Sequence, residues 1–346
     1  MKKETRLTFA SDYMEGAHPL ILRRLAETNA EKTAGYGLDE YSESAREKIR
    51  AACRTPEAAV FFLAGGTQTN AVMIDAFLRP WQGVIAAQSG HISVHEAGAI
   101  EFGGHKVLTL PHRAGKLTAE AIRKCMEAYL QDANHDHTVM PGMVYLSHPT
   151  EYGTLYSLRE LQSIHEVCRS FGISLYLDGA RLAYALACPE NDITLPDLGA
   201  LCDAFYIGGT KCGTLFGEAA VIPDRRALPH LFTMIKQHGA LLAKGRIAGL
   251  QFDVLFTDDL YLKIGGPAIE AAGRIRKALL AKGYELAVQS PTNQIFILLD
   301  RQRAAELSEA VEMSFMEQTD DGRLMMRIVT SWATGPEETD RLIACL

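Results

Sequence analysis

The sequence predicts an α/β fold, in which a mostly parallel sheet carries helices on both faces and a smaller α+β domain follows it. Two observations support this prediction. Short apolar runs alternate with segments of helical period through residues 58–209, which is typical of a parallel sheet covered by helices. After about residue 252 the alternation stops, and a long helical segment precedes two strand-like runs. We therefore expect a large domain at 16–252, a small domain at 253–346, and a segment at 1–15 that packs against the small domain or the active site.

The expected elements follow one another in a regular order. In the large domain, strands are expected at 58–64, 83–87, 143–147, 173–178 and 204–209, with helices at 69–79, 95–102 and 157–172. In the small domain, a helix at 268–283 precedes strands at 293–300 and 324–332 and a final polar helix at 336–346.

Composition limits the possible partners and location. The 346 residues are 47% hydrophobic and 22% charged, enough to bury a large core. A formal net charge of −7 provides no basic field for nucleic acid or anionic lipid, and the longest apolar run, residues 58–64, is far shorter than the roughly 20 residues of a membrane span. Seven scattered cysteines fit reduced thiols. We expect a cytoplasmic protein that binds neither nucleic acid nor membrane.

The residues that follow each apolar run are the candidate site, because ligands of open parallel sheets bind at the carboxyl ends of the strands. These residues carry varied chemistry. They are Gly65-Gly66-Thr67-Gln68, Ser89-Gly90-His91, His148-Pro149-Thr150-Glu151, Asp178-Gly179-Ala180-Arg181 and Gly209-Thr210-Lys211.

The glycines and threonine after the first run suit a phosphate. Backbone N–H groups at a helix start, together with the Thr67 hydroxyl, can bind an anion. For this stretch alone, a plain strand-to-helix turn with Thr67 as helix cap is the better explanation. The stretch also lacks the glycine spacings of a dinucleotide site or a P-loop.

Asp178 and Lys211 suggest which phosphate-bearing ligand to expect. A carboxylate at the end of an apolar strand needs a cationic or proton-donating partner, such as a pyridinium nitrogen, although Asp178 could instead cap the next helix. Lys211 stands at the end of the next expected strand, where a desolvated amine has a lowered pKa and can form a Schiff base. Phosphate site, aspartate and lysine are together the three points by which proteins hold pyridoxal 5'-phosphate (PLP).

Motifs along nearly the whole chain resemble those of the low-specificity L-threonine aldolases, which are fold-type I PLP enzymes related to aminotransferases. The resemblance runs from about residue 8 to the SWAT segment near residue 332, and the DGAR and GGTK pair is its most specific part. The motifs are FASDYMEGAHP, YGLDE, GGTQTNA, GHISVHEAGAIEF, GKLT, HPTEYGTLYSLREL, LYLDGARLAYA, YIGGTKCG and KQHGALLAKGRIAG.

The resemblance implies catalytic roles for three residues. Lys211 would bind the PLP aldehyde, Asp178 would hold the pyridinium proton, and His91 would stack on the ring and carry protons. His91 and His95 are spaced i,i+4 and could be metal ligands or helix residues without a special role. Because HISVHE lacks the HExxH order and no third ligand is evident, no metal is expected.

The resemblance also assigns binding residues. Gly66, Thr67 and Gln68 would hold the cofactor phosphate, with Arg246 of a neighbouring subunit adding a positive charge. Arg246 could equally be a surface charge on a helix.

Two arginines and a serine would hold the carboxylate of an amino-acid substrate. Arg181, also placed at the cofactor, and Arg327 are similar to the family's carboxylate binders, and Ser11 would assist them. Taken alone, Arg327 reads as a charge on a half-exposed strand.

The implied reaction is PLP-dependent retro-aldol cleavage of L-threonine, L-allo-threonine or a related β-hydroxy-α-amino acid to glycine and an aldehyde such as acetaldehyde. The enzyme would be a homodimer or homotetramer with active sites at the subunit interface. The alternatives are another fold-type I PLP lyase, namely a phenylserine or β-hydroxyaspartate aldolase or a β-eliminating lyase, or a cofactor-free binding protein.

One departure from the family concerns the residues after the strand at 143–147. Many threonine aldolases carry Glu-Asn-Thr-His there, whereas this chain has SHPTEYG. The base that acts on the substrate hydroxyl and the preference between threo and allo substrates are therefore open. Glu96 and Glu151 are candidates, although a structural role is the simpler expectation for each, and Cys212 beside Lys211 has no assigned role.

Overall fold

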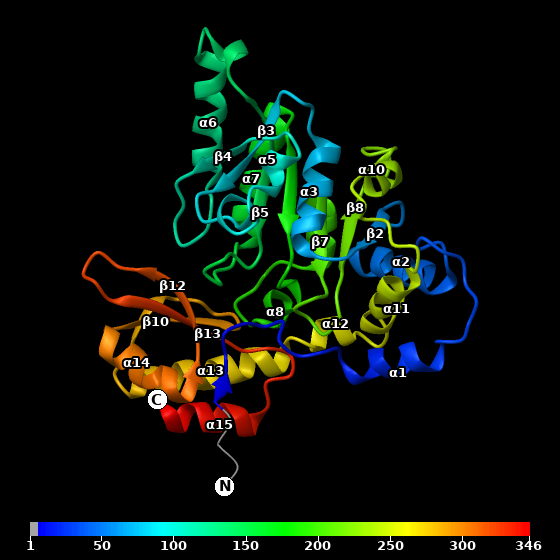
Figure 1. The fold of residues 1–346 in the computed structure, drawn as a ribbon. Helices are drawn as coiled ribbons and strands as arrows, with labels where there is room; N and C mark the ends of the chain where they lie inside the picture. The colour runs from blue at the N-terminus through cyan, green and yellow to red at the C-terminus, as the bar shows by residue number, and fades with distance from the viewer. Residues whose placement is uncertain (1–5) are drawn as a thin grey trace.

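A seven-stranded sheet forms the centre of the computed structural model, which describes residues 6–346 (Figure 1). The strand order is β2-β8-β7-β6-β5-β3-β4, and β8 alone runs opposite to the other six strands. The predicted α/β fold with a mostly parallel sheet is confirmed. The strands are β2 (Ala59–Leu63), β3 (Gln82–Ala87), β4 (Val107–Leu110), β5 (Met140–Ser147), β6 (Ser174–Asp178), β7 (Ala204–Gly208) and β8 (Glu218–Ile222).

Helices cover both faces of this sheet, and an apolar core lies on each face. One face is covered by α3 (Gly66–Phe77), α4 (His91–Val94), α5 (Ala99–Phe102) and α10 (Leu231–Gln237). The other face is covered by α1 (Pro19–Glu27), α2 (Glu40–Cys53), α6 (Ala119–Gln131), α7 (Leu158–Phe171), α8 (Leu182–Ala187), α9 (Leu195–Leu201), α11 (Arg246–Leu255) and α12 (Leu260–Lys263). Because the central strands are covered on both sides, they need continuous apolar runs, and every residue of β7 is buried.

Two features of the large sheet differ from the expectation. The strands β4 and β8 lie outside the predicted ranges. β4 is an edge strand without a buried residue, and β8 is antiparallel to both of its neighbours. The segment 95–102, expected as one helix, instead begins just after α4, which ends at Val94, and contains only the single turn α5. Ala97 and Gly98 between them have φ values of 53° and 72°, which a continuous helix cannot accommodate.

A second, antiparallel sheet with strand order β12-β13-β10-β9 lies to one side, with its own apolar core (Figure 1). Its elements are β9 (Glu285–Val288), β10 (Gln294–Leu299), β12 (Ser314–Gln318) and β13 (Leu324–Val329), with helices α13 (Gly266–Ala281), α14 (Arg301–Ala310) and α15 (Pro336–Cys345). The expected domain boundary at residue 252 falls inside α11. Within residues 6–346, no helix has the length and apolar character of a membrane span.

The N-terminal segment joins the two sheets. Strand β1 (Leu7–Thr8) pairs in parallel with β11 (Val311–Glu312), and the Phe9 carbonyl accepts a hydrogen bond of 2.8 Å from the Val329 N–H of β13. Three residues further on, Asp12 reaches Arg181 after β6. Residues 7–12 thus bind the small sheet on one side and the large sheet on the other.

Candidate functional site

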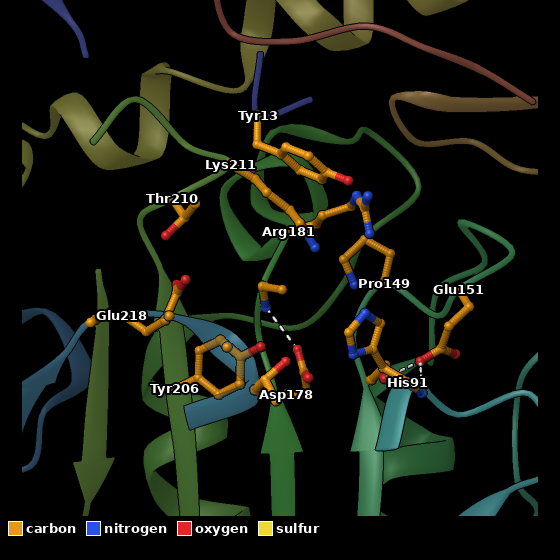
Figure 2. Close-up of a pocket in the computed structure, with 16 residues that line it drawn as sticks. Tyr13, His91, Pro149, Glu151, Asp178, Arg181, Tyr206, Thr210, Lys211 and Glu218 are labelled. Carbon is orange, nitrogen blue, oxygen red and sulfur yellow. Dashed lines mark hydrogen bonds between the residues drawn. The ribbon is translucent and has the colours of Figure 1, made fainter. Parts of the chain in front are cut away.

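A cavity of about 300 Å³ lies where the parallel strands of the large sheet end (Figure 2). Of the predicted site residues, it contains Gly66, Thr67, His91, Asp178, Arg181 and Lys211. Its remaining lining residues are Tyr13, Ala64, Gly65, Ser147, Pro149, Glu151, Ala180, Tyr206, Thr210 and Glu218.

Lys211 enters the cavity from the turn that follows β7. It makes no ion pair within 4.0 Å in the described part of the chain, and burial, aided by the positive charge of Arg181, lowers the pKa of its amine. Gly208 and Gly209 allow this turn to pack on backbone. A Cβ atom would lie 2.3 Å from the Ala180 carbonyl oxygen at Gly208 and 2.5 Å from the Gly217 carbonyl oxygen at Gly209. A lysine with a lowered pKa has a larger fraction of nucleophilic neutral amine.

Asp178 ends β6 as a buried carboxylate. Its Oδ2 accepts a hydrogen bond of 2.6 Å from the Tyr145 hydroxyl, and its Oδ1 accepts one of 2.9 Å from the Ala180 N–H. Burial alone would raise the pKa of Asp178, but hydrogen bonds from Tyr145 and Tyr206 outweigh burial and leave this pKa below its usual value. The bond to Ala180 is a local turn bond and not the helix cap considered above, because the N-cap of α8 is Arg181. It leaves the negative charge available to a cationic ligand.

His91 begins the short helix α4 and is held from two sides. Its Nδ1 lies 2.7 Å from Glu96 Oε1, and its backbone N–H donates to Glu151 Oε1 over 2.8 Å. The His91 and His95 rings have centroids 5.7 Å apart, yet no group of three or more residues suited to a metal occurs among the described residues. Glu151, for which a structural role was the simpler expectation, lines the cavity, and burial raises its pKa.

The start of α3 places backbone N–H groups at the cavity, as an anion site would require. Gly66 and Thr67 line the cavity in the first turn, where backbone N–H groups have no acceptor within the helix. Gln68 does not line the cavity, because its side-chain oxygen accepts a hydrogen bond of 3.1 Å from the Ala64 N–H.

Arg181 is oriented by a residue that sequence analysis did not single out. Its Nε and Nη2 donate to the two carboxylate oxygens of Asp12 over 2.7 and 3.0 Å, and Asn293 donates to the same carboxylate. Asp12 is fully buried, and this partner keeps its pKa below its usual value although burial opposes ionisation. The pair fixes the guanidinium at the cavity wall.

Arg327 and Ser11 lie at the junction of the two sheets rather than in the cavity wall. Arg327 donates to Gln294 over 3.1 Å, has no carboxylate within 4.0 Å in the described region, and leaves its Nε without a partner there. Burial and the charge of Arg181 lower the pKa of Arg327 to about 10. The Ser11 hydroxyl is also buried without a partner in residues 6–346, so both groups have hydrogen-bonding capacity for an anion.

Arg246 is not brought to the Lys211 cavity of its own chain. Its Nη2 donates to the carbonyl and hydroxyl oxygens of Thr28, both over 2.8 Å. With Lys32 and Lys244 it lines a separate cavity of about 400 Å³.

Glu218 is the cavity residue that sequence analysis missed most clearly. Because β8 is antiparallel, its first residue, and not its last, reaches the edge where the other strands end. The carboxylate accepts a hydrogen bond of 2.9 Å from the Gly209 N–H, and burial raises the pKa of Glu218 to about 7. Glu218 therefore does not follow a strand in the sequence but begins one.

Comparison with known proteins agrees with this geometry. The model of the beta-eliminating lyase family matches residues 8–313. The low-specificity L-threonine aldolase of Pseudomonas aeruginosa is 30% identical over 341 residues, which are 96% of this chain and 95% of that protein. The chain belongs to the low-specificity L-threonine aldolase family. It is thus an enzyme of the carbon–carbon lyase class.

Solved structures extend the comparison. The Leishmania major threonine aldolase is 43% identical with a TM-score of 0.94, and the match covers 98% of each chain. The aspartate aminotransferase of Thermus thermophilus, 16% identical with a TM-score of 0.72 over 98% of this chain and 90% of that one, shares the fold. The resemblance found in the sequence motifs is therefore confirmed.

Proposed function

We propose that this family member binds PLP and cleaves L-threonine, L-allo-threonine or a related β-hydroxy-α-amino acid to glycine and an aldehyde. One observation carries the proposal. A buried amine with a lowered pKa, a buried carboxylate that stays ionised and a helix start with free N–H groups share one cavity.

These groups fit the three ends of PLP. Lys211 would bind the aldehyde carbon, Asp178 the protonated ring nitrogen, and the N–H groups of Gly66 and Thr67 the phosphate, while His91 would face the ring. When bound, the cofactor supplies an electron sink for the pair released at the substrate Cα.

The protein's own contribution is orientation and proton transfer. Arg181, held by Asp12, and Arg327 would bind the substrate carboxylate, which sets the direction of the bond to be broken. His91 would take the proton of the β-hydroxyl, directly or through water, and a proton returned to Cα completes glycine. Glu151, beside the start of α4, is the second candidate for the hydroxyl proton.

The names of the relatives favour this aldol cleavage over the β-eliminating alternative. We expect the purified enzyme with PLP to release acetaldehyde and glycine from threonine, and no pyruvate from serine. Lys211→Ala should abolish both the visible absorbance of the bound cofactor and its fixation by borohydride, because the covalent bond is lost.

The exposed Lys277 provides the matched control, so Lys277→Ala should keep both signals and the activity. Absence of aldehyde from every β-hydroxy amino acid tested, or a normal spectrum in Lys211→Ala, would contradict the proposal.

We further propose a homodimer or homotetramer in which Arg246 serves the site of a neighbouring subunit. Support comes from the position of Arg246 in a basic cavity separate from the Lys211 cavity of the same chain. A cytoplasmic location is also proposed, which the seven unpaired cysteines support.

A further inference from the structure

Glu96 is a buried acid beside His91, outside the cavity lining, and its contacts give it more than a packing role. Its side chain has no exposed surface, whereas that of His91 is 37% exposed. Its Oε1 lies 2.7 Å from both His91 Nδ1 and Asn70 Nδ2, and its Oε2 has no hydrogen-bond partner in residues 6–346. Because a carboxylate is costly to bury, the contacts with His91 and Asn70 must stabilise the Glu96 side chain.

The same contacts connect His91 with Asp178. Asn70 Nδ2 donates to Glu96 and, over 3.2 Å, to Asp178 Oδ2, so one amide bridges the two acids. On the other side, Ser147 donates to Glu151 over 2.6 Å and contacts the Tyr145 hydroxyl at 3.2 Å. Because the Ser147 and Tyr145 hydroxyl hydrogens both go to carboxylates, their mutual contact is not a hydrogen bond, and the chain of bonds is open there. The continuous part runs from Asp178 through Asn70 and Glu96 to His91, whose backbone N–H continues it to Glu151. Figure 2 shows His91 between Asp178 and Glu151.

The orientation of the Asn70 amide decides the direction of the hydrogen bonds to Glu96. The Tyr176 hydroxyl donates to Asn70 Oδ1 over 3.0 Å, so the amide nitrogen must face the acids, where an amide oxygen would be repelled. Glu96 Oε1 is then an acceptor from Asn70 and, as a carboxylate oxygen, an acceptor from His91 as well. Consequently the proton of a neutral His91 ring is on Nδ1, and Nε2 carries the free lone pair.

We propose that Glu96 is a positioning residue that holds His91 as the Nδ1–H tautomer and thereby makes Nε2 the proton acceptor at the cavity. The catalytic meaning of this inference rests on the proposed aldol cleavage. A proton released by the substrate hydroxyl would move to Nε2, and the Glu96 carboxylate would stabilise the resulting imidazolium. The same proton would then pass to the substrate Cα, which completes glycine and restores the neutral ring for the next turnover. No redox partner is required.

Nitrogen NMR of ¹⁵N-histidine-labelled protein tests the tautomer without any assay of activity. His91→Asn identifies the His91 signals among those of the 11 histidines. At pH 8, with and without PLP, we expect a protonated Nδ1 and an unprotonated Nε2 in the wild type. Glu96→Ala should shift His91 to the Nε2–H form, which an imidazole without a partner on Nδ1 prefers. Glu96→Gln keeps an acceptor oxygen and should retain Nδ1–H.

Glu101, exposed on α5, is the matched control, and Glu101→Gln should leave the His91 signals unchanged. An unprotonated Nδ1 in the wild type would overturn the proposal. Retention of the Nδ1–H form in Glu96→Ala would overturn it as well.

Steady-state kinetics test the consequence for the reaction. Glu96→Ala should lower kcat about 100-fold and Glu96→Gln about tenfold, each with KM within about threefold of wild type, because proton transfer and not binding is impaired. Unchanged kcat in both variants, with thermal unfolding showing native folds, would contradict a positioning role. If the wild type cleaves no β-hydroxy amino acid, the proposed function fails, while the NMR result still decides whether Glu96 sets the tautomer.

Discussion

The charged residues of the cavity lie so close together that each one affects the pKa of its neighbours. Lys211, Arg181 and Glu218 lie in one buried wall, where burial disfavours every charge and each pairing offsets part of that cost. Asp12 forms its ion pair with Arg181 and not with Lys211. Lys211 therefore has no ion pair among the described residues. Glu218 is hydrogen-bonded to the turn before Lys211, and burial raises its pKa to about 7.

Glu218 should make stability depend on pH. Burial raises its pKa from 4.5 to about 7, so the folded cofactor-free protein binds this proton more tightly than the unfolded chain does. The stabilisation that comes from this tighter proton binding is therefore fully present below about pH 4.5 and is lost as pH rises through about 7. Glu218→Gln mimics the protonated acid and should be more stable than wild type at pH 8, by up to about 3 kcal/mol in urea unfolding, but not at pH 4.5.

The exposed Glu309 on α14 gives the control, because Glu309→Gln should leave the free energy of unfolding unchanged at pH 8 and at pH 4.5. Equal stability of Glu218→Gln and wild type at pH 8 would show that Glu218 is ionised at little cost.

At the scale of elements, the close packing of α2 on α11 requires a glycine. A Cβ atom on Gly249 of α11 would lie 2.1 Å from Ser42 Oγ and 2.7 Å from Ser42 Cα. Ser42 cannot give way easily, since it is buried and both its N–H and its hydroxyl donate to Asp39. The α2–α11 contact therefore depends on a residue without a side chain.

Two alanine substitutions should separate this packing effect from helix propensity. Gly249→Ala should lower the free energy of unfolding by roughly 1–3 kcal/mol through overpacking. Gly273→Ala, in α13 with nothing within 4 Å of the added Cβ, should raise it by about 0.5–1 kcal/mol. Urea denaturation of both variants is the measurement, and a stabilised Gly249→Ala would mean that the helices can separate at little cost.

At the scale of the whole molecule, binding groups come from segments far apart in the chain. Residues 7–12 pair with β11, bond to β13 of the small sheet and then supply Asp12 to Arg181, 169 positions away. Arg327 of β13 approaches from the small sheet, where its pKa responds to Arg181 and Asp12. The substrate-binding groups therefore depend on how the two sheets are held together.

Subunit complementation should test whether Arg246 completes a neighbouring site. Lys211→Ala and Arg246→Ala should each be inactive, but co-expression should restore up to about a quarter of wild-type activity. Half of the randomly formed dimers are then hybrids. In each hybrid, one of the two sites combines an intact Lys211 with the intact Arg246 of the other subunit, so about a quarter of all sites are active. Lys277→Ala in place of Lys211→Ala provides the control for mixing. Failure of the two inactive variants to complement would place the function of Arg246 within its own chain.

Local pattern was enough to predict the parallel sheet and the residues at its strand ends. Buried parallel strands need continuous apolar runs, which can be recognised in the sequence. The reactive residues that follow these runs, including Lys211, Asp178 and His91, can therefore be identified from the sequence alone. The sequence by itself therefore determined the fold class and the main groups of the cavity.

Only the tertiary structure decided which residues orient those groups. Glu218 lies on an antiparallel strand whose direction depends on pairing, Asp12 meets Arg181 across 169 positions, and Glu96 meets Asn70 across 26. Such contacts leave no periodicity or spacing in the sequence, because they arise from the register and packing of distant elements. The direction of a strand and the partner of a buried acid are properties of the folded molecule.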